Sequence, residues 1–221
     1  MSDWRQLLDR VIIGLNRLRE NGQPTPHWVL GGGTALMLHT GHRLSKDIDA
    51  FIDDPQYLTI LSPRLSGESV WRCEAFSESA NHLKLTYPEG EIDFIVASVI
   101  TGLSAERKSI DPDNAKADAQ PAVVDVEHPV EIVLKKLLHR GSLLKVRDIF
   151  DIAVVDSRYH LLLRDNLRHV AHLKQAILAR LSNISEEFCR EELAELDIAS
   201  GWRSVGDSCL KKVKEIAESI P

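Results

Sequence analysis

Apolar residues in the first part of the chain follow two different periods. Over residues 3–20 they recur every three or four positions, which predicts a helix with one buried face. Further on, short apolar runs between turn residues predict strands. The predicted strands are 28–30, 47–52, 69–76, 82–87, 91–96 and 122–126, and short helices are expected at 34–39 and 55–61. The turn sequence Pro88-Glu89-Gly90 predicts that two of these strands form a hairpin.

The second part of the chain has a helical pattern from Pro129 onward. The expected helices are 130–139, 146–155, one or two within 161–181, 185–196 and 207–220. Residues 101–120 are polar and weakly patterned, so we expect a long loop there, with at most a brief helix or strand. The pattern therefore predicts an α+β protein in two domains. Residues 1–127 would form a small mixed sheet with the helix of residues 1–22 packed on it, and residues 128–221 a helical bundle.

Composition describes an ordinary globular protein with a sizeable core. The chain has 221 residues, of which 43% are hydrophobic and 27% charged. Its apolar runs are far shorter than the ~20 residues that span a bilayer, and the N-terminus lacks the apolar core of a signal peptide. We therefore expect a cytoplasmic protein that does not enter a membrane. The three cysteines are far apart in sequence, which favours free thiols over a zinc site or a disulfide framework.

Charge is unevenly distributed along the chain. The net charge of −6 argues mildly against a protein that simply coats nucleic acid. Acidic residues predominate over 47–127, whereas Lys and Arg predominate over 128–180. Two interpretations remain open: solvated surfaces that differ by chance, or a basic surface that serves a phosphate-rich substrate near an acidic, metal-binding strand region.

Two aspartates on a predicted strand are the first candidates for chemistry. Asp47 and Asp49 flank Ile48, and residues two apart on a strand project to the same side. Two parallel carboxylates repel each other unless a cation neutralises them, and Mg²⁺ prefers oxygen ligands. Asp93 lies in another apolar strand and would complete a three-carboxylate cluster if that strand is adjacent. The alternative is that these aspartates simply face water at strand edges.

A glycine-rich turn precedes the first aspartate. Gly31, Gly32, Gly33 and Thr34 open a short helical pattern, and such a turn lets backbone N–H groups approach phosphate oxygens. The turn matches neither a P-loop nor the dinucleotide-binding glycine motif. Considered alone, it fits an ordinary strand–helix connection as well as a phosphate cradle.

A third cluster of charged residues lies in the helical half. On a helix, Lys136 and Arg140 share one face, as do Asp148 and Asp151. Arg147, Asp148 and Asp151 could form a structural ion-pair network, or a basic residue placed here could instead hold a triphosphate. The histidines have no metal-ligand spacing, and we expect none of them to bind a metal.

Together these motifs resemble the AbiEii/AbiGii toxin-type nucleotidyltransferases of the DNA polymerase β-like superfamily. The superfamily signature is a Gly-Gly or Gly-Ser turn, about ten residues, an Asp-x-Asp/Glu strand motif and a third carboxylate on a later strand. Gly32-Gly33, Asp47 with Asp49, and Asp93 match it. The narrower resemblance lies in Gly32 to Leu36, in Arg43 and Ser45 before the aspartates, and in Lys136 with Arg147, Asp148 and Asp151.

The resemblance implies a minimal nucleotidyltransferase fold, a small mixed or antiparallel sheet flanked by helices, with a C-terminal helical bundle. It implies catalytic carboxylates that hold Mg²⁺ or Mn²⁺, namely Asp47, Asp49 and Asp93. It implies nucleotide binding by Gly32, Gly33, Thr34, Arg43, Ser45, Lys136, Arg147, Asp148 and Asp151. The implied reaction transfers an NMP from an NTP to a hydroxyl of RNA, including tRNA, or of protein.

The resemblance further implies a toxin that is controlled by a cognate antitoxin protein. Two other classes of function remain open from the sequence. One is a nucleotide- or RNA-binding module that keeps the fold without turnover. The other is an interaction protein that uses its carboxylates only structurally.

Overall fold

The computed structural model describes residues 4–66, 68–111 and 121–221. The chain forms two compact units. The first comprises Met1–Ala35, Ser45–Ser98 and Ala105–Glu127, and the second Leu36–Leu44, Val99–Ser104 and His128–Pro221, with the gaps just named. Part of the loop expected at 101–120, residues 112–120, lies outside the described residues, as does Asp3 at the start of the first predicted helix.

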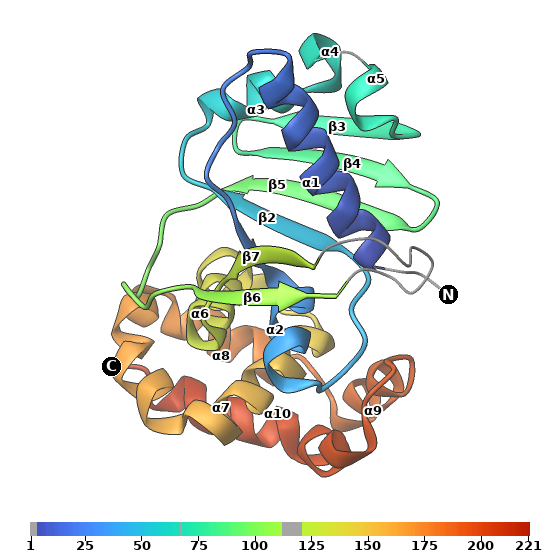
Figure 1. The fold of residues 1–221 in the computed structure, drawn as a ribbon. Helices are drawn as coiled ribbons and strands as arrows, with labels where there is room; N and C mark the ends of the chain where they lie inside the picture. The colour runs from blue at the N-terminus through green and yellow to red at the C-terminus, as the bar shows by residue number, and fades with distance from the viewer. Residues whose placement is uncertain (1–3, 67, 112–120) are drawn as a thin grey trace. The chain divides into compact units, whose positions relative to one another are not determined.

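Helix α1 (Trp4–Glu20) confirms the first predicted helix. Its buried face contains the apolar positions that gave the helical period, including Leu7, Leu8, Val11 and Leu15. The helix crosses one face of the sheet and contacts strands β2 and β5 (Figure 1). The sequence therefore determines which side of this helix is covered, because the apolar stripe has to be removed from water.

A seven-stranded mixed sheet forms the centre of the first unit. Its strands are β1 (Val29–Gly31), β2 (Ile48–Ile52), β3 (Ala75–Ser79), β4 (His82–Tyr87), β5 (Gly90–Val96), β6 (Glu106–Ile110) and β7 (Ala122–Val126). They are ordered β3-β4-β5-β2-β1-β7-β6. The pairs β1–β7 and β2–β5 are parallel, and the other neighbours are antiparallel.

The central strands alternate between buried and partly exposed residues. In β2, Ile48, Ala50 and Ile52 are buried while the residues between them are only half-buried, and β4 and β5 show the same alternation. The predicted hairpin is confirmed, because Tyr87 and Gly90 are register partners. One face of the sheet is thus apolar, which leaves the other face for polar side chains.

One prediction about a strand was wrong. Residues 69–76 do not form one strand: helix α5 (Glu68–Trp71) occupies the first part, and β3 starts only at Ala75. The Trp71 indole donates to the carbonyl of Leu61 (2.6 Å), and its ring meets Phe94 edge-on, so burial of this side chain outweighs the local strand propensity. The loop expected at 101–120 does contain the brief strand that the prediction allowed: polar strand β6 pairs with β7 at the edge of the sheet.

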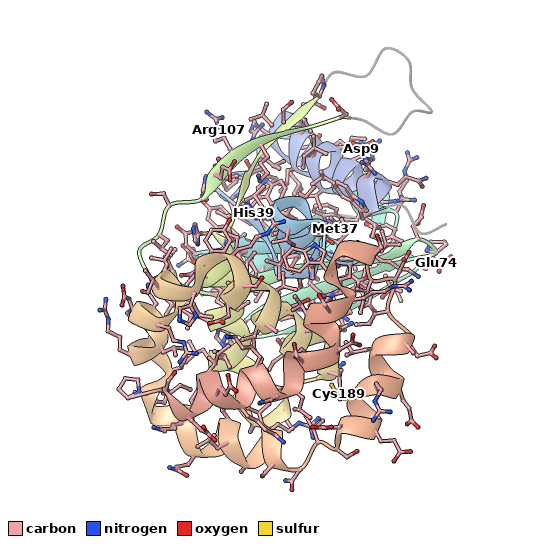
Figure 2. The ribbon with its side chains drawn as sticks, turned by 90° about the horizontal axis from the view of Figure 1, so that it is seen from below. Asp9, Met37, His39, Glu74, Arg107 and Cys189 are labelled. Carbon is pink, nitrogen blue, oxygen red and sulfur yellow. The ribbon has the colours of Figure 1, made fainter. Side chains whose placement is uncertain are left out.

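The connections in the first unit contain two more short helices, α3 (Gln56–Leu61) and α4 (Pro63–Ser66). Helix α2 (Gly32–Thr40) follows β1 directly and begins two residues earlier than the sequence suggested. Met37 and His39 are on its second half (Figure 2).

Helices make up most of the second unit. They are α6 (Pro129–Arg140), α7 (Val146–Asn166), α8 (Lys174–Ser182), α9 (Glu186–Ala194) and α10 (Arg203–Glu218), with 3-10 turns at Gly141–Leu143, Leu167–Leu173 and Ser200–Trp202. Helices α7 and α10 lie side by side (Figure 1). The Ser185 hydroxyl caps α9 by accepting from the N–H of Phe188 (3.1 Å).

Several helix boundaries in this unit differ from the prediction. Helix α7 continues past Val155 to Asn166, with one non-helical residue at Tyr159. Helix α10 begins at Arg203, so neither Asp207 nor Ser208 starts it. The apolar period is visible in both helices. Where each helix begins and ends, however, depends on tertiary packing, which local propensity does not determine.

The observed architecture confirms the predicted fold class: a mixed sheet flanked by helices, followed by a bundle of helices. Within the part of the chain that the structure describes, no helix is both long enough and apolar enough to cross a membrane.

Candidate active site

Strands β2 and β5 place two aspartates beside each other. The strands run parallel, and Asp49 is the register partner of Asp93. Their neighbours Ile48 and Ile92 are fully buried, so the aspartates project to the opposite, polar face. The sequence predicted Asp93 as a partner on the condition that its strand is adjacent, and this condition is met.

The glycine turn lies directly against this pair. Strand β1 pairs with β2 so that Gly31 is opposite Asp49. Gly32, the next residue, has φ +63°, and a Cβ built on it would lie 1.7 Å from Oδ2 of Asp49. Only glycine leaves room for the carboxylate at this position, which explains why a glycine must stand at the start of α2.

Thr34 connects the turn to the first aspartate. Its buried side-chain hydroxyl donates a 2.6 Å hydrogen bond to the backbone carbonyl of Asp47. The carboxylate of Asp47 in turn accepts from the N–H of Glu91 (3.2 Å), at the start of β5. The Thr34 hydroxyl therefore stabilises the loop before β2, and the backbone N–H groups of the helix start remain the candidates for phosphate contact.

Two basic residues of β4 surround the third carboxylate. His82 Nε2 lies 2.8 Å from Asp93 Oδ1, and Lys84 Nζ lies 3.9 Å from Asp93 Oδ2. Burial raises the pKa of Asp93, and the His82 and Lys84 side chains oppose this shift only in part. A 2.5 Å hydrogen bond to Glu91, followed by the nearby carboxylate charges, raises the pKa of Lys84. Asp93 is thus a carboxylate with increased affinity for a proton.

Sequence reasoning did not identify His82 and Lys84 as part of this site. The signal was present, however, in the hairpin that the turn at Pro88 and Glu89 predicts. A tight hairpin fixes the strand register, and the observed register places Lys84 opposite Asp93. Counting back from the turn would therefore have located both residues on the face of Asp93.

The carboxylates have the chemistry of a site for a hard divalent cation. Asp47, Asp49 and Asp93 supply only oxygen donors, which is the ligand type of Mg²⁺. Within the described ranges, no three His, Cys, Asp or Glu side chains are grouped closely enough to hold a metal ion as they stand. The register instead gives a pair, Asp49 and Asp93, with Asp47 held toward Glu91. The oxygen donors of these residues fit such a cation, and Asp49 and Asp93 are its main candidate ligands.

The second unit contains a separate, buried network of charges centred on Asp151. Its carboxylate accepts hydrogen bonds from Nε and Nη2 of Arg43 (2.8 and 2.9 Å) and from Nε2 of His42 (2.8 Å). The ammonium of Lys136 lies 2.8 Å away. Asp151 and His42 are fully buried. Burial alone would raise the pKa of Asp151, but the charges of Lys136 and Arg43 hold it well below the usual range.

Lys136 extends this network to a second aspartate. Its ammonium donates to Asp148 (2.6 Å), whose other oxygen accepts from the N–H of Lys145 (3.2 Å). Burial by itself would lower the pKa of Lys136, but the two carboxylates outweigh it and raise the pKa. In the same way, Lys136 lowers the pKa of Asp148 despite its burial. Every charge of this cluster has a partner, as buried charges require.

The predicted nucleotide-binding residues of the helical half are thus partly assembled. Arg43, Lys136, Asp148 and Asp151 form one network, and Arg147 is exposed on α7. The ammonium of Lys136 lies close to two carboxylates, 2.6 Å from Asp148 and 2.8 Å from Asp151. The structure thus shows ion pairs of Asp148 and Asp151 with Lys136 and Arg43, and not with Arg147 as the sequence suggested. Nucleotide binding by these residues and by Ser45 stays a prediction.

The fold and the carboxylate face define a class of protein. A mixed sheet that carries an aspartate pair beside a glycine turn is the arrangement expected of a nucleotidyltransferase. The solved structure of MenT4, a nucleotidyltransferase toxin from Mycobacterium tuberculosis, has a similar fold, with a TM-score of 0.51. The match covers 97% of this chain and 87% of MenT4, at 16% sequence identity.

The family model described as nucleotidyl transferase AbiEii toxin, type IV toxin–antitoxin system, matches residues 15–217. The chain therefore belongs to the AbiEii nucleotidyltransferase toxin family, as its motifs suggested. No significant match is found among curated proteins.

Proposed function

We propose that this protein transfers a nucleoside monophosphate from an NTP to an acceptor hydroxyl, in a reaction that depends on Mg²⁺ or Mn²⁺. The position of Asp49 is the observation that carries the proposal. Asp49 is the register partner of Asp93, and its carboxylate lies close to where a Cβ on Gly32 would be. Carboxylates beside a backbone turn at a helix start combine a cation site with an anion site, which is what a metal–triphosphate substrate requires.

Each residue of the first unit has a part in this proposal. Asp49 and Asp93 would hold the cation, with Asp47 as the third ligand. The backbone N–H groups of Gly33 and Thr34 would donate to phosphate oxygens. Thr34 would also keep the loop before β2 in place through its bond to the Asp47 carbonyl (2.6 Å).

The bound cation would neutralise the triphosphate and lower the pKa of the acceptor hydroxyl. Asp93 is the candidate to accept the proton of that hydroxyl, because its place beside Asp49 puts it next to the position where the cation would bind. The hydroxyl oxygen then attacks the α-phosphorus in line with the leaving pyrophosphate.

We further propose that the acceptor is RNA, such as the 3′ end of tRNA, or a protein, and that transfer makes the protein toxic to its host. Membership of the AbiEii toxin family supports the toxic role and the existence of a cognate antitoxin. MenT4, which shares the fold, is likewise a nucleotidyltransferase toxin. A basic stretch in the helical half is compatible with a phosphate-rich acceptor.

Incubation of the pure protein with each α-labelled NTP and total RNA tests this proposal. We expect label in RNA with at least one NTP when Mg²⁺ is present, and none when EDTA replaces the metal. Parallel reactions with a protein extract as acceptor test the other class of substrate. Equilibrium NTP binding is measured on the same samples.

The results distinguish an enzyme that transfers NMP from a protein that only binds nucleotide. NTP binding without transfer to any RNA or protein would favour the alternative, a binding module that has kept the fold. Absence of both binding and transfer, whichever metal is supplied, would leave the carboxylates with a structural role only.

A further inference from the structure

Two of the three cysteines lie side by side in the second unit. Cys189 is on α9 and Cys209 on α10, and their sulfur atoms are 3.9 Å apart. Both side chains are buried, whereas Cys73 belongs to the first unit. Figure 2 labels Cys189 on its helix. Sequence spacing did not predict this pair, because nineteen other residues separate the two cysteines.

We propose that Cys189 and Cys209 are a modification site: a hydroperoxide converts this dithiol into a reversible disulfide that ties helix α9 to helix α10. A disulfide has an S–S bond of about 2.05 Å, so the two sulfurs have to approach by roughly 2 Å. Rotation about the two side-chain χ1 angles moves sulfur atoms over distances of this size. Helices α9 and α10 already hold the two thiols next to each other.

Access for a small oxidant is available close to the pair. Leu193 lies one helical turn after Cys189, and Gly206 lies about one turn before Cys209. Both line a surface pocket of about 260 Å³. A hydroperoxide needs little more room than two water molecules, so this pocket brings it within one turn of each thiol.

The two thiols differ in the way that peroxide chemistry requires. The hydrogen bond with Cys209 lowers the pKa of Cys189, and the same bond, together with burial, raises the pKa of Cys209. Cys189 is therefore the attacking thiolate, which takes one oxygen from hydrogen peroxide to form a sulfenic acid and release water. The Cys209 thiol then attacks the sulfenic sulfur, the S–S bond forms and a second water leaves. Two electrons pass from the thiols to one peroxide.

The disulfide would close a loop over the segment between α9 and α10. This segment is hydrogen-bonded to the residues before the aspartate motif: Asp197 accepts from the N–H of Leu44 (2.9 Å), and the N–H of Ala199 donates to His42 (3.0 Å). Arg43, between those two, holds Asp151. Oxidation would therefore restrain the backbone that supports the buried charge network.

Mass spectrometry of the full-length protein tests the proposal. The protein is treated with hydrogen peroxide, quenched in acid and unfolded in an alkylating agent before digestion with trypsin. We expect a cross-link between the peptides 181–190 and 204–211, two hydrogens lighter than the two separate peptides together, that reductant removes. The disulfide should raise Tm by on the order of 5 °C, because it restricts the conformations of the unfolded chain.

Near-isosteric variants provide the controls. Cys73→Ser should form the link as the wild type does, while Cys189→Ser and Cys209→Ser should keep their fold and form no intramolecular link. Oxidation of Cys73 in the peptide 73–84 shows that the oxidant was effective. The proposal is overturned if Cys73 is oxidised while Cys189 and Cys209 remain thiols, or if these two gain oxygen atoms instead of a bond.

Discussion

Gly32 shows how one residue without a side chain determines the position of a functional carboxylate. Its φ of +63° excludes most side chains, and a Cβ there would fall 1.7 Å from Oδ2 of Asp49. Two separate constraints, backbone conformation and space, therefore act at this position. Gly41, at the other end of the same helix, shares only the first: its φ is +61°, and its Cβ would meet no atom within 4 Å.

This difference gives a matched pair of variants. Gly32→Ala should displace the Asp49 carboxylate and reduce transfer at least about 100-fold, since a shift of ~1 Å in a reacting group has effects of that size. Gly41→Ala carries the same backbone strain without the clash, so its specific activity should stay close to wild type. Initial rates with α-labelled NTP and circular dichroism of both variants check this. Equal losses in the two variants would show that strain alone is responsible.

Individual residues also show what the sequence could and could not reveal. Asp93 was predictable, because an aspartate among apolar strand residues needs a reason to be there. His82 and Lys84 were not recognised, because neither belongs to a motif and their role depends on register. Arg43 and Lys136 were recognised as important, but sequence spacing could not show that buried carboxylates already bind them.

At the scale of elements, helices α6 and α7 are joined by ion pairs in place of an entirely apolar contact. Lys136 of α6 lies between Asp148 and Asp151 of α7. In the intact network each buried charge is neutralised by another, but a buried charge that loses its partner strongly destabilises the fold. The stability of this helix pair should therefore depend strongly on each charge.

Asp151→Asn should lower the free energy of unfolding by about 3 to 5 kcal/mol at pH 7, because it leaves Lys136 and Arg43 with an uncompensated buried charge. Asp165→Asn, an exposed change on the same helix, should have an effect within about 0.5 kcal/mol. Urea unfolding curves of both variants measure the difference. A cost for Asp151→Asn no larger than that of the control would contradict the role assigned to the network.

Stability should also depend on pH through these carboxylates. The folded state lowers the pKa of Asp148 and holds that of Asp151 well below its usual range. Their contribution is therefore fully present above the unfolded pKa of about 3.9 and is lost as pH falls through the lower, folded values. The stability gap between wild type and Asp151→Asn should shrink below about pH 4. Unfolding curves from pH 3 to 7 test this, and a constant gap would count against it.

Elements differed in how well the sequence predicted them. The amphipathic helix α1 and the hairpin β4–β5 follow from local period and turn chemistry, which act within a few residues. Helix α5 was mispredicted, and the sequence left open whether strand β6 forms, since the burial of Trp71 and the pairing with β7 are tertiary effects. The register of Asp49 with Asp93 belongs to the same class, because no local rule makes β2 and β5 neighbours.

At the scale of the whole molecule, the family match extends well beyond the motifs. The motifs read from the sequence cover about residues 30–155, whereas the family model covers 15–217 and therefore includes α8, α9 and most of α10. The helical half is thus a regular part of the toxin family and not an unrelated addition. Its basic stretch and its cysteine pair lie within the matched residues, as the carboxylates do.

The transfer assay with carboxylate variants tests the central claim most directly. Asp49→Asn and Asp93→Asn each remove the negative charge and one oxygen of the pair, and Asp53→Asn changes an exposed acid just after β2. We expect at least about a 100-fold loss of Mg²⁺-dependent label transfer in the first two, because mutating even an outer partner of a metal site costs 10- to 100-fold. Asp53→Asn should transfer at the wild-type rate. Folded Asp49→Asn and Asp93→Asn proteins that transfer label as fast as wild type would contradict the claim that this carboxylate pair carries the reaction.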